Sequence, residues 1–208
     1  MQFGQTVVTI GREYGSGGHE IGSQLAQLMG VPFYDREVLT RAARDSGICE
    51  DVLSEYDEKA SSGYLFSLAA GVSAAAEGTG FSMGMPLNHR VFLAQFEAIT
   101  KIASEGPGVI VGRCADYVLR ERSNVVNFFL YAPVEGRIRR IMEVENLSYI
   151  QAKDRVRRVD KQRQNYYNFF ADGNWGHRGN YHMMVSTEGL SIQAAAELLL
   201  EFVKKFRT

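Results

Sequence analysis

The sequence contains very little cysteine and proline, with two and four residues among 208. Cys49 and Cys114 are too few and too far apart to form a metal-binding framework, and we expect both to be buried free thiols. No stretch approaches the roughly 18 consecutive apolar residues that a membrane-spanning helix requires. The formal net charge of −1 gives no general attraction to nucleic acid or to an anionic membrane. These shortages argue against a metal-scaffolded, membrane-spanning or broadly nucleic-acid-binding protein.

The N-terminus lacks the basic segment followed by an apolar run that is typical of a secretion signal. The composition, with 45% hydrophobic and 23% charged residues, is that of a soluble globular protein. A chain of 208 residues is also long enough to bury a hydrophobic core. We therefore expect a single cytoplasmic domain that spans residues 1–208.

Apolar runs predict five strands, at residues 6–10, 31–34, 107–113, 125–131 and 182–186. Segments with apolar residues at helical spacing lie between them, and a last helix follows the fifth strand. The alternation of strands and helices predicts an α/β fold, a doubly wound five-stranded parallel sheet with helices on both faces. Ligands of such sheets bind at the carboxyl ends of the strands.

Two segments differ from this core, which comprises residues 1–53 and 89–208. Residues 54–88 are rich in Gly, Ser and Ala and predict a small cap or acceptor-binding insert. The apolar, methionine-containing stretch around Phe81, Met83 and Met85 is a candidate homodimer contact. Residues 148–181 form a long charged segment, interpreted as a helical lid.

The loop after the first strand is the most informative segment. Gly15, Ser16, Gly17, Gly18 and His19 precede a helical pattern, and glycines allow backbone N–H groups to turn inward around an anion. The helix dipole favours negative charge at the same place. The loop therefore predicts a phosphate-binding site, and the alternative is a tight strand-to-helix turn without a ligand.

The loop departs from the standard phosphate-loop pattern GxxxxGK[ST]. Arg12 stands in the place of the first glycine, Gly18 in that of the lysine, and His19 in that of the magnesium-binding hydroxyl. The dinucleotide pattern GxGxxG also fails, because Glu20 occupies the place of its third glycine. Hydride-transfer chemistry is therefore not favoured.

Four segments carry a resemblance to a known family: IGREYGSGGHEIG (10–22), PFYDREVL (32–39), VIVGRCADYVL (109–119) and RRVDKQR (157–163). Together they resemble the cytidylate kinase-like family, a branch of the nucleoside monophosphate kinases with the P-loop NTPase fold. The resemblance implies transfer of a phosphoryl group from ATP, with Mg²⁺, to a small phosphorylated acceptor such as CMP. The partner is then a small-molecule nucleotide, and no metal-binding residues are predicted in the chain itself.

The resemblance also implies roles for residues that bind the acceptor. Asp35, with its neighbour Arg36, matches the aspartate that helps to bind the monophosphate nucleotide. Arg113 matches the arginine that binds the acceptor phosphate. Asp116 is displaced from the position of the aspartate that follows this arginine in the family.

Cations of the lid are expected to act on the transferring phosphoryl group, because phosphoryl transfer depends on positioning and on charge stabilisation. Arg158, Lys161 and Arg163 resemble the lid residues of the family, although the same run also fits a solvated helix face. Arg12 is a hypothetical substitute for the missing lysine. His19 is open between a phosphate contact, a helix cap, a metal contact and an ordinary hydrogen-bonded role.

Because the lysine is missing, the sequence is consistent with two functions. One is an ATP-dependent phosphotransferase, the other a catalytically inactive nucleotide- or anion-binding regulatory protein that keeps the kinase fold. Trp175, Tyr166 and Tyr167 suit either base stacking or core packing, and core packing is favoured. The other histidines show no convincing metal-ligand spacing and are interpreted as structural.

Overall fold

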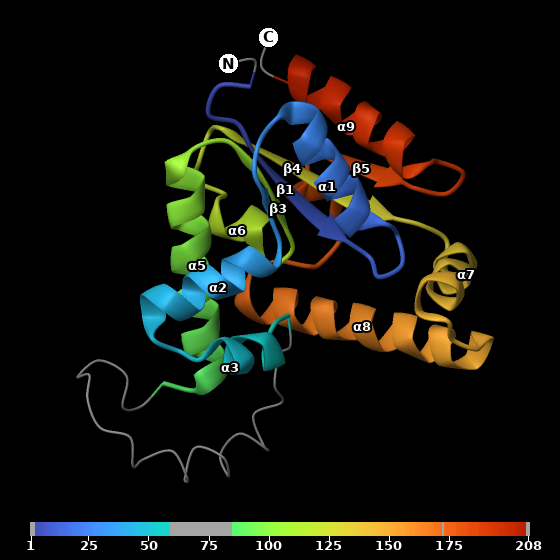
Figure 1. Ribbon diagram of the computed structural model, residues 1–208, viewed down its shortest axis with the longest axis horizontal. Coiled ribbons are helices and arrows are strands. Elements are labelled where there is room, and N and C mark those ends of the chain that lie inside the picture. Colours follow the sequence, from blue (N-terminus) through green and yellow to red (C-terminus); the bar gives the residue numbers. More distant parts are fainter. Residues whose placement is uncertain (1–2, 59–84, 172, 207–208) are drawn as a thin grey trace.

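The computed structural model describes residues 3–58, 85–171 and 173–206 (Figure 1). Its centre is a five-stranded sheet in the order β2-β3-β1-β4-β5 with every pair parallel. The strands are β1 (Val7–Arg12), β2 (Phe33–Tyr34), β3 (Gly108–Val111), β4 (Val125–Tyr131) and β5 (Met183–Ser186). The predicted doubly wound parallel sheet is confirmed.

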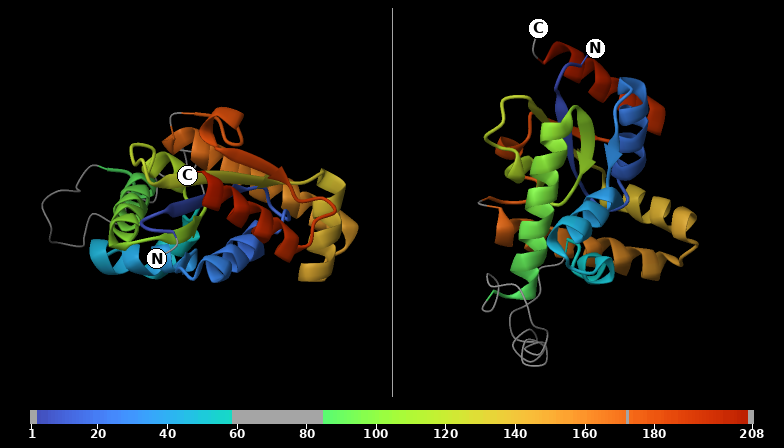
Figure 2. Two further views of the ribbon diagram at one scale, coloured as in Figure 1. Left: turned by 90° about the horizontal axis from the view of Figure 1, so that it is seen from above. Right: turned by 60° about the vertical axis from the view of Figure 1, so that its left-hand side comes forward.

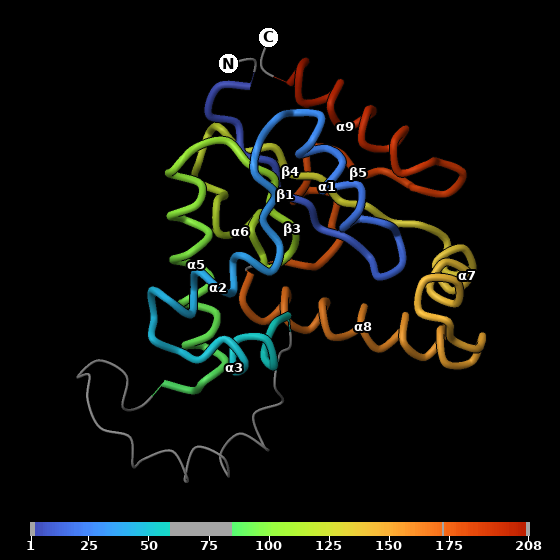
Figure 3. Tube along the Cα trace, in the orientation of Figure 1, coloured from blue at the N-terminus to red at the C-terminus, as the bar shows by residue number. Residues whose placement is uncertain are grey.

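Helices cover both faces of the sheet. They are α1 (Gly18–Met29), α2 (Arg36–Ser46), α3 (Glu50–Glu55), α5 (Leu87–Glu105), α6 (Ala115–Val118), α7 (Val134–Glu145), α8 (Tyr149–Phe170) and α9 (Ile192–Lys205), with a short 3₁₀ helix η1 (Arg178–Asn180). The right-hand view of Figure 2 shows β1 and β3 between α5 on one side and α1 with α9 on the other. The Cα trace in Figure 3 shows α2 and α3 beside α5, on the same side of the sheet.

The strands are apolar throughout because both of their faces are buried, as is usual for parallel sheets. In β1, Val7 joins the core cluster beneath α2, α3 and α5, whereas Val8 and Ile10 join the cluster beneath α1 and α9. Successive strand residues point to opposite faces, so each strand contributes to both cores. This packing fixes the carboxyl ends of β1 and β3 side by side.

Helices α7 and α8 form a pair at the carboxyl ends of the strands. Ile138 and Ile141 of α7 pack against Ala152 and Val156 of α8 in a small core of their own. A capping box at Ser148 starts α8, which then runs unbroken for 22 residues. In Figure 1 this helix lies across the molecule below the tips of the strands, so the predicted lid segment lies near the expected ligand site.

Some expectations fall outside the described residues or differ from the structure. Residues 59–84, most of the predicted insert and including Phe81 and Met83, lie outside the described ranges, while Met85 is exposed. Cys114 is buried as expected, but Cys49 is exposed, so the expectation of a buried thiol there was wrong. Cys49 is the N-cap residue of α3 and lies at the surface. Among the helices of the described ranges, none is both long and apolar enough to cross a membrane.

Candidate functional site

The glycine-rich loop joins the end of β1 to the first turn of α1. Gly15 and Gly17 have φ angles of +80° and +79°, in the left-handed region that glycine adopts without steric cost. Gly17 is the N-cap of α1 and has no side chain to accept a hydrogen bond from the first turn. The first N–H groups of a helix have no partners within it and carry its positive dipole end. The predicted residues 15–19 therefore lie where an anion is favoured.

The buried Arg137 and the partly buried Asp160 hold this loop in place. Arg137 of α7 donates to the carbonyl oxygens of Ala132 (2.9 Å) and Tyr14 (3.1 Å). Asp160 of α8 pairs with Arg137 and accepts a hydrogen bond from the backbone N–H of Tyr14 at 2.7 Å. Arg137 also forms an ion pair with Glu13 at 3.2 Å. The loop and the lid helix are thus joined through a shared set of ion pairs.

The side chain of Arg12 lies against Gly18, the residue in the place of the usual lysine. A Cβ atom built on Gly18 would lie 2.7 Å from Cβ and 2.9 Å from Cγ of Arg12, closer than van der Waals contact. A side chain at position 18 would therefore collide with Arg12. The absence of lysine and the presence of Arg12 are two aspects of one arrangement.

Hydrogen-bond donors from three segments converge on the carboxylate of Glu58, next to Arg12. Nη1 of Arg12 lies 2.5 Å from Oε1 of Glu58, and Nε of Arg163 lies 3.1 Å from Oε2. The backbone N–H of Arg113 donates to Oε1 at 3.0 Å. Burial opposes ionisation, but the nearby guanidinium groups of Arg12, Arg163 and Arg113 outweigh it and lower the pKa of Glu58. Guanidinium groups and backbone N–H groups are also the donors with which proteins bind other oxyanions.

Gly112, at the end of β3, is required for this convergence. Its φ is +78°, and a Cβ there would lie 2.0 Å from Oε1 of Glu58 and 2.1 Å from Nη1 of Arg12. The next two residues, Arg113 and Cys114, also have left-handed φ angles of +53° and +54°, which are uncommon for side chains larger than glycine. This backbone turns the N–H of Arg113 toward Glu58.

The side chain of Arg113 is nearly completely buried and is held by two other carboxylates. Its Nη1 lies 2.8 Å from Asp35 and its Nη2 lies 2.7 Å from Asp57. Burial disfavours its charge, but Asp57, Glu58 and Asp35 outweigh that effect and raise the pKa of Arg113. Its Nε is buried without a hydrogen-bond partner among the described residues, an unfavourable state that a further acceptor would relieve.

The remaining predicted site residues lie at different distances from this cluster. Nδ1 of His19 is 2.9 Å from Oδ2 of Asp35, so His19 joins the first turn of α1 to the start of α2. Arg36 is exposed at the first residue of α2. Arg158 and Lys161 are on the exposed side of α8, where Lys161 donates to Gln164. Of the predicted lid cations, Arg163 is the one that lines the pocket.

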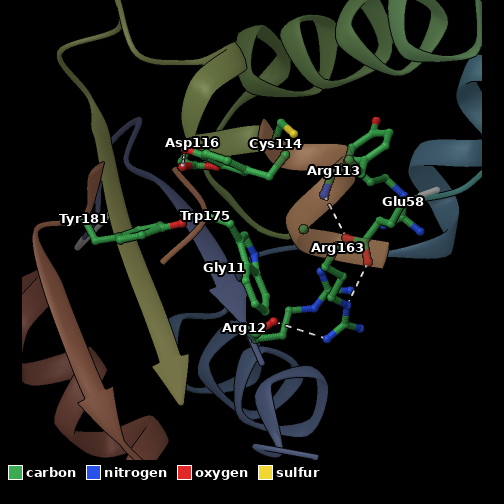
Figure 4. Close-up of a pocket in the computed structure, with 12 residues that line it drawn as sticks. Gly11, Arg12, Glu58, Arg113, Cys114, Asp116, Arg163, Trp175 and Tyr181 are labelled. Atoms are coloured by element: carbon green, nitrogen blue, oxygen red, sulfur yellow. Dashed lines mark hydrogen bonds and ion pairs between the residues drawn. The ribbon is translucent and has the colours of Figure 1, made fainter. Parts of the chain in front are cut away.

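A small cavity of about 20 Å³ adjoins the cluster and extends toward an aromatic end. Figure 4 shows Arg12, Arg163 and Glu58 at one end and Asp116 with Tyr181 at the other. Asp116 is buried in α6 and accepts a hydrogen bond from the hydroxyl of Tyr167 at 2.7 Å. Burial raises the pKa of Asp116 to about 6. Tyr166, Tyr167 and Trp175 of the predicted lid segment pack in a hydrophobic cluster and also line this pocket.

Replacing Asp116 with Asn should change the pH dependence of stability. The folded-state pKa of Asp116 is raised to about 6 from 3.8, so the folded protein binds this proton more tightly than the unfolded chain does. The protonated Asp116 carboxyl therefore stabilises the folded state below pH 4, and this stabilisation is lost as the pH rises through about 6. Relative to wild type, Asp116→Asn should gain on the order of 2 kcal/mol in free energy of unfolding between pH 4 and pH 7. Urea denaturation at the two pH values, with the exposed-site variant Asp154→Asn as control, measures this; a pH-independent difference would contradict it.

Sequence reasoning missed Asp57, Glu58 and Arg137. The two carboxylates stand at the start of the insert, whose Gly, Ser and Ala content drew attention away from its few charges. Arg137 lies in an arginine-rich helix that begins just after β4. Its place just after a strand end could have marked it as a candidate, because ligands bind at the carboxyl ends of the strands. Arg137 is buried because α8 packs against α7, and the hydrophobic periodicity of the sequence does not show where α8 packs.

Comparisons with known proteins agree with the fold described above. The model of the cytidylate kinase-like family matches residues 7–189. An uncharacterized protein from Eubacterium ventriosum is 24% identical over 97% of this chain and 99% of its own, with a TM-score of 0.72. A shikimate kinase from Bacteroides thetaiotaomicron is 12% identical over 96% and 98%, with a TM-score of 0.54. TT1252 from Thermus thermophilus is 17% identical over 98% of both chains, with a TM-score of 0.51. These likenesses are of fold, and no curated protein matches the sequence.

Proposed function

The chain belongs to the cytidylate kinase-like family, and we propose that it is an ATP-dependent phosphotransferase that acts on a small phosphorylated acceptor, a nucleoside monophosphate such as CMP. One observation carries the proposal. Guanidinium groups of Arg12 and Arg163 converge on a single oxyanion position, beside a glycine loop that opens a helix. Guanidinium groups and helix N-termini are the groups that proteins use to bind phosphate.

The residues of the loop fit a polyphosphate. The N-cap glycine exposes the first N–H groups of α1, and the fixed loop lies next to Arg12. In our proposal Arg12 takes the part of the missing lysine, entering from β1 because Gly18 leaves room for it. Arg163 approaches from the lid helix and stabilises negative charge on the transferring group, as arginine does in other phosphoryl transfers.

The fit to Mg²⁺ rests on fewer residues. His19 replaces the usual hydroxyl, and the described ranges contain no group of three acidic, His or Cys side chains suited to a metal. Mg²⁺ in kinases is held largely by phosphate oxygens and water, with few protein ligands. We therefore propose that Mg²⁺ comes with ATP, where it neutralises phosphate charge.

The acceptor phosphate is assigned to Arg113. Its guanidinium is oriented by Asp35 and Asp57 and retains the unpartnered Nε. A cation that is fixed before the ligand arrives loses little entropy on binding it. Asp35 connects this residue to His19 at the donor loop, so the two sides of the proposed reaction share one hydrogen-bonded chain.

A coupled assay for ADP release tests the proposal, with ATP, Mg²⁺ and CMP, dCMP, UMP or AMP. Nucleotide-dependent thermal shifts are measured on the same sample, because a ligand that binds the folded state raises its apparent stability. We expect ADP release that requires an acceptor and is abolished in Arg163→Ala. Arg157→Ala, an exposed cation on the same helix, should retain activity.

The inactive alternative is favoured by one observation, the glycine in the place of the lysine. A thermal shift with ATP but no ADP release with any acceptor would support a nucleotide-binding regulatory protein. The absence of both signals would contradict nucleotide binding altogether.

A further inference from the structure

We infer that Glu58 is an internal phosphate mimic: its carboxylate occupies the position of a ligand phosphoryl group, and ligand binding displaces it. This inference rests on the proposed function, because it takes the ligand of the site to be a phosphorylated molecule. The donors around Glu58 are two guanidinium groups and one backbone N–H. The same donors suit the oxygens of phosphate.

Charge balance argues that Glu58 and a phosphate exclude each other. The buried cluster contains three guanidinium groups and three carboxylates, and so carries no formal charge: Arg12, Arg113 and Arg163 with Asp35, Asp57 and Glu58. A phosphoryl dianion added to this set would meet the Glu58 carboxylate with little screening. With Glu58 displaced, the cluster carries a formal charge of +1, and Arg12 and Arg163 lose the carboxylate with which both form ion pairs, which favours an anion.

Steric packing supports the same conclusion. The Glu58 carboxylate and the Arg12 guanidinium both press against the backbone of Gly112, at distances that leave no room for even a Cβ atom. The side chains of Arg12, Glu58 and Arg163 are 11%, 13% and 14% exposed. A tetrahedral anion can reach Arg12 and Arg163 together after the carboxylate has moved out.

The backbone of Glu58 favours displacement. Its φ of +51° lies in the left-handed region, which is uncommon for a residue with a side chain. Asp57, the preceding residue, is held independently by Arg113. Glu58 can therefore leave Arg12 and Arg163 while the turn after α3 stays attached through Asp57, and a backbone change at Glu58 that accompanies displacement would relieve an uncommon conformation.

Binding of inorganic pyrophosphate, measured by isothermal titration calorimetry, tests the inference. A site that its own residue occupies most of the time shows an apparent affinity reduced in proportion. We expect Glu58→Gln to bind pyrophosphate about tenfold more tightly than wild type. Glu55→Gln, which removes the same charge from the exposed end of α3, should bind as wild type does. Equal or weaker binding by Glu58→Gln would overturn the inference, since it would make Glu58 a support for the arginines.

A crystal structure of the wild-type protein grown with pyrophosphate supplies a second test that does not depend on the stability of a variant. We expect phosphate oxygens on Arg12 and Arg163, with the Glu58 carboxylate moved away from both. Pyrophosphate bound elsewhere, with the Glu58 ion pairs intact, would overturn the inference.

The outcomes separate this inference from the proposed function. Tighter binding of pyrophosphate by Glu58→Gln, without phosphoryl transfer by the wild-type protein, would support displacement of Glu58 and contradict the proposed kinase activity. Turnover with unchanged pyrophosphate affinity would support the activity and overturn displacement. Failure of both proteins to bind pyrophosphate would overturn displacement, whatever the assay of turnover shows.

Discussion

Replacement of Arg12 by Ala is expected to lower kcat for phosphoryl transfer by about 10²–10³-fold, the usual effect of removing one group that stabilises transition-state charge. Arg12 lies against Gly18 and is one of the two guanidinium groups on the proposed phosphoryl position. Its loss removes positive charge where a kinase of the standard pattern has lysine. The measurement is steady-state ADP release with the best acceptor.

The variant should remain folded, because Glu58 keeps its contacts with Arg163 and with the backbone N–H of Arg113. Urea denaturation monitors this separately from activity. Arg157→Ala removes an exposed arginine from α8 and serves as the matched control. Full activity of folded Arg12→Ala would show that Arg12 does not replace the lysine.

Gly18→Lys should inactivate the protein even though it restores the lysine of the standard loop. The new Cβ would lie within 3 Å of Cβ and Cγ of Arg12. Inserting atoms into packed space typically costs about 1–3 kcal/mol, and here it would also push Arg12 away from the site. We expect ADP release to fall at least as far as in Arg12→Ala, with a lower free energy of unfolding.

The same lysine should restore activity when Arg12 is also changed. Arg12→Gly combined with Gly18→Lys removes the collision and gives the spacing GxxxxGK, with glycines at 12 and 17. We expect the double variant to be at least tenfold more active than either single variant, a non-additivity typical of residues in contact. Additive losses would contradict the view that Arg12 and a lysine at 18 are alternative solutions.

The fold could be predicted from the sequence because its signals are local. Apolar runs at β1 and β4 are continuous since both faces of those strands are buried. The glycines at 15–18 predicted a loop between the first strand and the following helix, and in the structure Gly15 and Gly17 have left-handed φ angles in that loop. The resemblance supplied the family, which the match over residues 7–189 shows.

The electrostatic arrangement of the site could not be predicted in the same way. Glu58 meets Arg12 and Arg163 across sequence separations of 46 and 105 residues. Periodicity does not report such pairings, which arise from the meeting of strand ends with α8. The cations of the predicted lid segment are an example. Arg158 and Arg163 look equivalent in the sequence, yet Arg158 is exposed and Arg163 lines the pocket. Whether Arg158 and Lys161 take part in catalysis stays a prediction.

We propose that the altered loop still supports transfer of a phosphoryl group from ATP. Phosphorus-31 NMR of ATP, Mg²⁺ and CMP with the wild-type protein tests this directly, because it identifies both products. We expect resonances of ADP and CDP that grow together, require the acceptor, and are absent with Arg163→Ala. Unchanged ATP after prolonged incubation of folded protein with CMP, dCMP, UMP and AMP would contradict it.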